Sequence, residues 1–177
     1  PPAYIDNKGV TYYRFLDGAE TLDQFLRHAT DKAFFEMLYA LIADLRLAHS
    51  NGILYGDRWP KNILVVPDKT KKKRQDGHVP RSLVHIDFDL DISGPAAREF
   101  ELAQVLYYVV CADRKRSLNV LPQLLALETS TPRFDFRAFA RYLEGHALFF
   151  KDDKEYGNAE KDIAALLAAI DTLRVSH

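Results

Sequence analysis

Asp57 and Asn62 lie five positions apart in "GDRWPKNILVV" (56–66), directly before an apolar run that is typical of a short buried strand. A carboxylate placed near a hydroxyl group can orient it and accept its proton. An amide oxygen is one of the hard oxygen ligands that Mg²⁺ prefers. The two residue types and their spacing therefore predict a polar site in which Asp57 acts as a base and Asn62 binds a metal ion.

A second apolar run (83–86) leads into "IDFDLD", so Asp87 and Asp89 follow a predicted strand as well. Two adjacent strands can bring their ends to one metal ion, which makes Asp87 the partner of Asn62 and Asp89 a second metal contact. Such a site serves metal-dependent phosphoryl transfer. Each of these polar residues, taken alone, is also an ordinary turn residue.

Apolar periodicity predicts the elements that must position these side chains. A helix is expected from about Asp31 to His49, with Asn51-Gly52 as its stop signal. A strand and turn are expected at 9–18, and the capping-box spacing of "TLDQ" begins a short helix at Thr21–His28. The apolar residues of the long helix are Phe34, Met37, Leu38, Leu41, Ile42, Leu45 and Ala48. Further helices are predicted at 97–112, 117–127, 135–150 and 158–175.

Composition indicates one globular domain over residues 1–177. Apolar residues make up 47% and charged residues 28%, and the net charge of −1 argues against a surface built for nucleic acid or an anionic membrane. The single cysteine favours a reducing compartment. We find no apolar run near the roughly 20 residues of a membrane helix and no signal peptide. These features predict a cytoplasmic or nuclear protein.

The polar segment 67–82 lies between the two predicted strands and contains the basic run Lys69–Arg74. One interpretation is a solvated hairpin loop. The alternatives are a nuclear-import signal or a local contact with an anion.

Three segments resemble the large lobe of the protein-kinase-like superfamily. "HSNGILYGDRWPKNILV" (49–65) and "VHIDFDLD" (84–91) are similar to its catalytic and metal-binding loops, and "YYRFLDGAETLDQFL" (12–26) is similar to its hinge and first helix. The resemblance implies a mainly α fold with a few short strands, and ATP and Mg²⁺ as cofactors. The adenine-binding surface that it implies consists of Phe15, Leu16, Leu64 and Ile86.

The chain also departs from the protein-kinase pattern. Tyr55-Gly56 precedes Asp57, Trp59 stands where protein kinases have a lysine, and Asp89 replaces the glycine of Asp-Phe-Gly. Gly56 before the aspartate resembles aminoglycoside and choline phosphotransferases, and Asp89 resembles the variant found in lipopolysaccharide-sugar kinases and fungal-type kinase-like proteins. Lys61 could replace the lysine only if the loop follows a different path.

A glutamate stands near the position of the family's structural aspartate at the start of the helix predicted over 97–112. Either Glu99 or Glu101 could take that role, and either could simply favour the helix dipole.

A glycine-rich loop and a strand lysine for the nucleotide phosphates are not found, so we expect the large lobe without its small lobe. Two functions follow. The first is the catalytic lobe of an ATP/Mg²⁺-dependent phosphotransferase that acts on a small-molecule or glycan hydroxyl and is weak or inactive without a small lobe or partner protein. The second is a pseudokinase-like binding or scaffold module.

Overall fold

The computed structural model of the chain describes residues 2–5, 11–13, 16–67, 80–86, 92–129 and 133–175. The predictions made for Phe15, Asp87, Asp89 and the basic run Lys69–Arg74 lie outside these described residues.

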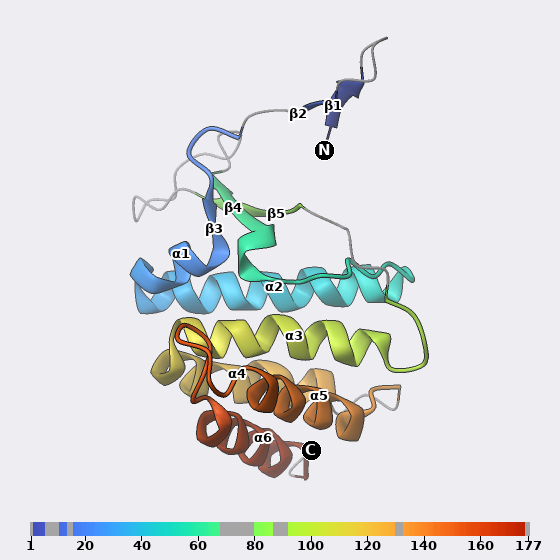
Figure 1. Cartoon of the computed structure of the whole chain (residues 1–177), viewed down its shortest axis with the longest axis vertical. Helices are drawn as coiled ribbons and strands as arrows, with labels where there is room; N and C mark the ends of the chain where they lie inside the picture. Colours follow the sequence, from blue (N-terminus) through green and yellow to red (C-terminus); the bar gives the residue numbers. More distant parts are fainter. Residues whose placement is uncertain are drawn as a thin grey trace.

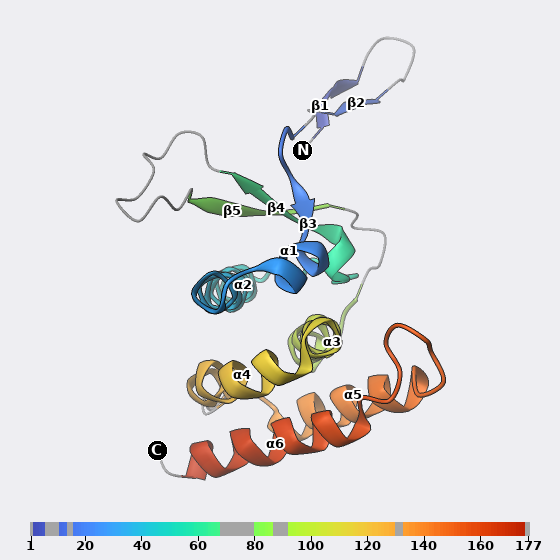
Figure 2. The same ribbon diagram turned by 90° about the vertical axis from the view of Figure 1, so that its left-hand side faces the viewer.

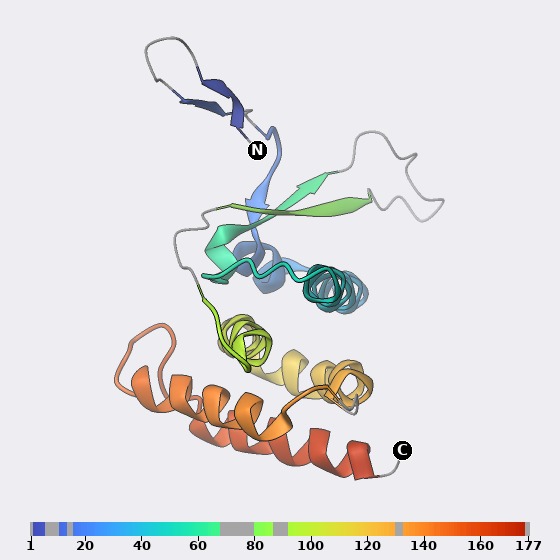
Figure 3. The same cartoon turned by 90° about the vertical axis from the view of Figure 1, so that its right-hand side faces the viewer.

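The described part of the chain is arranged in layers (Figure 1). A small sheet lies on α1 and α2, and α3 and α4 lie beneath them, followed by α5 and α6 (Figures 2 and 3). The helices are α1 (Leu22–His28), α2 (Asp31–Ser50), α3 (Ala97–Ala112), α4 (Arg114–Thr129), α5 (Phe136–Phe149) and α6 (Glu160–Val175). A single 3₁₀ turn, η1 (Pro60–Asn62), leads into the sheet.

The sheet consists of β3 (Glu20–Thr21), β4 (Ile63–Pro67) and β5 (Arg81–His85), in that spatial order and antiparallel. A separate pair is formed by β1 (Pro2–Ile5) and β2 (Thr11–Tyr13). Successive side chains of a strand point to opposite faces. Ile63 and Val65 are buried in the core, so Leu64 lies on the other face, opposite Val84 of β5.

Helix α2 forms where the sequence predicts it. Thr30 caps its first turn, because the hydroxyl oxygen accepts a hydrogen bond from the backbone N–H of Ala33 at 3.3 Å. All seven predicted apolar positions of this helix are buried. Gly52 ends the element with φ of 72°, in the left-handed region that favours glycine.

Helix α3 is buried around most of its circumference, since α1 and α2 cover one side and α5 and α6 the other. Three polar side chains interrupt this apolar surface and are themselves buried: Glu99, Glu101 and Gln104. A buried polar side chain is strongly unfavourable unless it is hydrogen-bonded, so each of these residues requires a partner.

The predicted fold class is confirmed at the level of a mainly helical chain with a small antiparallel sheet. Several element boundaries differ from the sequence prediction, and the short strands β1 and β3 were not predicted. Helix α4 begins at Arg114, three residues early, because the carboxylate of Asp113 accepts from the N–H of Arg116 at 2.9 Å. Strand β5 begins at Arg81, so Pro67, Arg81 and Ser82 of the predicted polar loop belong to the sheet.

No helix in the described ranges is long and apolar enough to cross a membrane.

Candidate active site

The loop between α2 and η1 carries Asp57 and makes three hydrogen bonds to side chains of α3. The backbone N–H of Gly56 donates to Glu101 Oε1 at 2.7 Å, and Glu101 Oε2 lies 2.6 Å from Nε2 of His49. Gly56 has φ of 85°, which a side chain would make strained. Glu101 therefore connects the loop and the end of α2 to α3.

Gln104 makes the other two contacts. Its Oε1 accepts from the backbone N–H of Arg58 at 2.7 Å, and its Nε2 donates to Asp57 Oδ1 at 3.1 Å. Because a backbone N–H can only donate, the orientation of the Gln104 amide is fixed, and its NH₂ group must face the carboxylate. Among the described residues no hydrogen bond reaches Asp57 Oδ2. Asp57 is therefore held through Oδ1 and half-buried, and no described residue occupies its Oδ2.

Asn62 lies beside Asp57, with its Nδ2 3.5 Å from the backbone carbonyl of Asp57. This orientation leaves the amide oxygen of Asn62 for another partner. The backbone N–H of Ile86 donates to the carbonyl of Asn62 at 2.9 Å, so the end of β5 lies next to Asn62. Within the described ranges no cluster of three or more His, Cys, Asp or Glu side chains could hold a metal ion. The predicted metal ligands Asp87 and Asp89 fall outside those ranges.

Two of the predicted adenine contacts share a face of the sheet. Leu64 pairs with Val84, and Ile86 stands two residues after Val84, so strand alternation places Leu64, Val84 and Ile86 on the face opposite to Ile63. Leu16 lies in the turn before β3, where its carbonyl accepts from the N–H of Ala19 at 3.1 Å. All three predicted contacts that are described are half-buried.

The side chain of Arg58 is fully buried beneath the loop, although it adjoins Asp57 in the sequence. Its guanidinium donates to Nδ1 of His85 at 3.0 Å and to the carbonyl of Tyr55 at 3.2 Å. Since arginine can only donate, Nδ1 of His85 is the acceptor, and the ring proton is on Nε2. That Nε2 lies 2.7 Å from Oδ2 of Asp44. A chain of hydrogen bonds thus connects Arg58 of the loop, through His85 of β5, to Asp44 of α2.

Tyr55 completes this network. Its ring stacks on His85 with centroids 4.0 Å apart and planes at 8°, and its hydroxyl donates to Asp44 Oδ2 at 3.3 Å. The hydrogen bond from His85 lowers the pKa of Asp44, against the opposing effect of its partial burial.

The lowered pKa of Asp44 predicts an acid-sensitive contribution to stability. The folded-state pKa lies below the ordinary value of 3.8, so the contribution is fully present above about pH 4 and is lost as the pH falls through the folded-state pKa. We expect Asp44→Asn to flatten the decline in free energy of unfolding below that pH. Urea unfolding at a series of pH values would measure how steeply the free energy of unfolding falls with pH in the wild-type protein and in the variant. Equal slopes for the two proteins would contradict the role given to Asp44.

Trp59 and Lys61, the two residues discussed for the position of the kinase lysine, both contact the segment that precedes α6. Trp59 stacks on Tyr108 with centroids 4.6 Å apart and meets Tyr156 edge-on at 5.5 Å. Lys61 Nζ lies 3.5 Å from Glu155 and 5.7 Å from the centre of the Tyr156 ring. Trp59 thus packs against α3 and the segment before α6, and Lys61 is engaged by that segment.

A groove of about 410 Å³ opens next to the loop and is mostly apolar. Gln104, the residue that contacts Asp57, is one of its lining residues, and Trp59 is another. A second hollow of about 440 Å³ adjoins it and shares Phe100 and Tyr142 with it. The remaining lining residues of the groove are Tyr108, Arg141, Gly145, His146, Phe149 and Phe150.

Sequence reasoning did not find Gln104, Arg58 or Asp44 as parts of this site. A usable signal existed for Gln104, because it is the one polar residue in the apolar run "LAQVLYYVV" (102–110). No comparable local signal marks Arg58 or Asp44, whose shared partner His85 lies 27 and 41 positions away.

Comparison of the chain with protein-family models, with curated proteins and with solved structures finds no match.

Proposed function

We propose that the chain is the large lobe of a kinase-like phosphotransferase that uses ATP and Mg²⁺ to phosphorylate a hydroxyl group. One observation carries the proposal: Asp57 is fixed by Gln104 through its side chain, and the backbone of the residues on both sides of it is fixed by α3. Catalytic groups require this kind of preorganisation. A simple turn aspartate has no need of it.

Each residue has a role in this proposal. Asp57 Oδ2 would accept the proton of the acceptor hydroxyl. The amide oxygen of Asn62 fits a metal ion, and Asp87 and Asp89 would complete its ligands. Bound Mg²⁺ would neutralise the phosphate oxygens of the nucleotide. The face that carries Leu64 and Ile86, with Leu16 and Phe15 from the hinge, would contact the adenine.

The groove beside Trp59 supports an acceptor with a large apolar or ring-shaped body. Gln104 lines the groove and also contacts Asp57. Aromatic rings of Trp59, Phe100 and Tyr108 line the groove as well. Rings of this kind bind flat apolar surfaces, while Gln104 and Arg141 offer hydrogen bonds to hydroxyl groups.

Nucleotide binding provides the first test. We expect Mg²⁺-ATP at about millimolar concentration to raise the melting temperature of the protein by mass action, and ATP with a chelator to raise it less. Asn62→Ala should remove most of the difference between the two conditions. Asn119→Ala, an exposed change of the same type on α4, is the matched control. Absence of any shift with Mg²⁺-ATP would count against the proposal.

The second candidate function is a binding module that keeps the fold without the chemistry. It is favoured by the aromatic packing of Trp59 and by the engagement of Lys61 with Glu155. No nucleotide-dependent shift, together with an intact fold, would select this alternative.

A further inference from the structure

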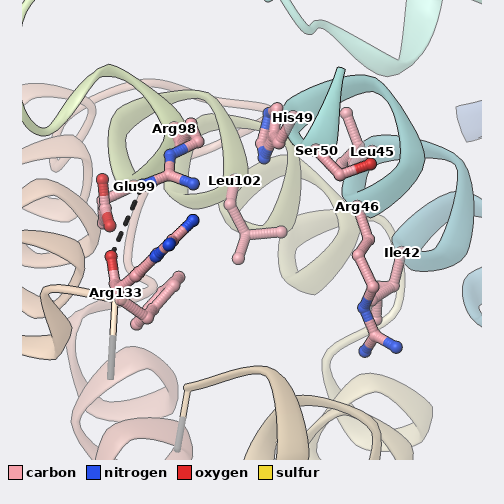
Figure 4. A pocket seen from close by; sticks show the side chains of 10 residues that line it. Ile42, Leu45, Arg46, His49, Ser50, Arg98, Glu99, Leu102 and Arg133 are labelled. Carbon is pink, nitrogen blue, oxygen red and sulfur yellow. Dashed lines mark hydrogen bonds between the residues drawn. The ribbon is translucent and has the colours of Figure 1, made fainter. Parts of the chain in front are cut away.

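The groove beside Trp59, with a volume of about 410 Å³, is connected to Asp57 by Gln104, which lines the groove and contacts the carboxylate. A smaller pocket of about 120 Å³ lies between α2 and the start of α3, with Arg98 and Arg133 on one side of it (Figure 4). Neither Gln104 nor Trp59 is among the lining residues of that smaller pocket. The chemistry of a ligand that reaches Asp57 is therefore inferred from the groove.

The charge of the groove disfavours a cationic ligand. Its lining, as far as the structure describes it, includes the basic residues Arg141 and His146 and no carboxylate. Burial lowers the pKa of His146 below its ordinary value of 6.5, so the ring is uncharged at neutral pH. A cation in the groove would meet Arg141 without a lining carboxylate to pair with, and the burial of an unpaired charge is unfavourable. An uncharged ligand avoids this cost.

His146 supplies a hydrogen-bond acceptor to the groove. Its Nδ1 lies 2.7 Å from the backbone carbonyl of Tyr142, and because a carbonyl only accepts, Nδ1 carries the ring proton and Nε2 is an acceptor. No hydrogen bond reaches Nε2 from the described part of the chain. Nε2 is also not one of the described side-chain atoms that are both buried and unpaired, so it remains accessible. The ring is held against Phe100 and Tyr107, with centroids 5.8 and 5.6 Å away. A ligand in the groove satisfies Nε2 only if it donates a hydrogen bond.

Aromatic side chains form much of the remaining lining. Trp59 stacks on Tyr108, and Phe149, which meets Phe150 edge-on at 4.8 Å, is 81% exposed. A ligand that covers these rings removes apolar surface from water. Most of the accessible lining surface is apolar, so a sugar, with hydroxyl groups around its ring, would leave several of them without a partner. A flat aromatic body matches this lining better.

We propose that the groove binds an uncharged aromatic alcohol with two hydroxyl groups, whose role as the acceptor rests on the proposed phosphotransfer. One hydroxyl group donates to Nε2 of His146. The other faces Asp57, where its oxygen bonds to the γ-phosphorus of ATP, ADP leaves and the proton passes to Oδ2 of Asp57. The volume of the groove is sufficient for two fused rings, because pockets of about 300–1,000 Å³ hold drug-sized ligands.

Isothermal titration without nucleotide tests the selectivity of the groove. Naphthalene dimethanol is the probe, and its dimethyl ether has the same rings without a hydrogen-bond donor. Choline and glucose represent cationic and polyhydroxylated acceptors. We expect the diol to bind at least about tenfold more tightly than each of the other three, since the ether, for example, leaves Nε2 of His146 without a donor. Equal affinity for the diol and its ether, or tighter binding of choline, would overturn the proposal.

A variant of His146 isolates the hydrogen bond. His146→Phe keeps an aromatic ring against Phe100 and Tyr107 and removes the acceptor, so the advantage of the diol over its ether should fall at least about fivefold. His28→Phe, at an exposed histidine of α1, is the matched control. An undiminished advantage in a folded His146→Phe protein would refute the role of His146.

Phe149→Ala tests the aromatic lining at a site whose exposure leaves the fold intact. The change should weaken binding of the diol about three- to tenfold, because an aromatic contact is lost. Leu148→Ala is the matched control, since Leu148 is 66% exposed and is not one of the lining residues. Equal affinities of the two variants for the diol would show that the ligand does not occupy the groove.

Turnover with ATP and Mg²⁺ separates the class of acceptor from the proposed function. A higher kcat/KM for ADP release with glucose or choline than with the diol would contradict the class of acceptor and leave phosphotransfer standing. Selective binding of the diol without transfer to any of the compounds would contradict phosphotransfer and support the selectivity of the groove.

Discussion

Replacement of Arg58 by methionine is expected to lower the free energy of unfolding by about 2–6 kcal/mol. The change removes the donors of Nδ1 of His85 and of the carbonyl of Tyr55, and each buried acceptor left without a donor costs about 1–3 kcal/mol. Methionine is flexible and similar in length, so it limits the cavity that the change leaves. Urea unfolding monitored by circular dichroism would measure the loss from the midpoint and slope.

Two further variants make the result specific. Arg137→Met, at an exposed site, should change stability by no more than about 0.5 kcal/mol. Arg58→Met combined with His85→Leu should recover part of the loss, because removal of both hydrogen-bonding partners leaves fewer unsatisfied groups. A cost for Arg58→Met as small as that of Arg137→Met would show that this chain of hydrogen bonds contributes little.

The second large effect is expected on turnover. Asp57→Asn should reduce phosphate transfer to a hydroxyl acceptor by about 10²- to 10⁴-fold, the usual contribution of a general base. Asparagine retains an oxygen that can accept from Gln104, so the loop should keep its position. Binding of Mg²⁺-ATP should change little, because the role of Asp57 begins with the acceptor. Release of ADP with a panel of sugars and other alcohols would measure the rate.

Asp152→Asn, at an exposed position before α6, is the matched control and should retain the rate. If transfer is measurable and Asp57→Asn proceeds at full rate, Asp57 is a turn residue, and the proposed mechanism is wrong.

Helix α2 was predictable because one local pattern determines it. Its apolar residues recur at steps of three and four, and each of them is buried in the structure. Asn51-Gly52 and Thr30 add local end signals. The strands β4 and β5 were predictable for a similar reason, because each is a short apolar run that is flanked by polar segments. Such elements can be predicted from the local sequence alone, without knowledge of distant parts of the chain.

The polar support of the site could not be predicted in the same way. The two residues that Gln104 contacts lie 46 and 47 positions away from it in the sequence. Asp44 and His85, which contact each other, are 41 positions apart. A single sequence has no local pattern for such pairs. The positions of Asp57 and Asn62 were predicted from spacing and strand context, but the residues that hold them become visible only once α2, α3 and β5 are assembled.

Trp59 is the only tryptophan in the chain, and it stands two residues after Asp57 in the wall of the groove. Its emission therefore reports on a single location, stacked on Tyr108. A molecule that enters the groove would change the polarity around the indole and hence the wavelength and intensity of its fluorescence. Candidate acceptors can accordingly be screened by optical titration of the unlabelled protein before any reaction is known.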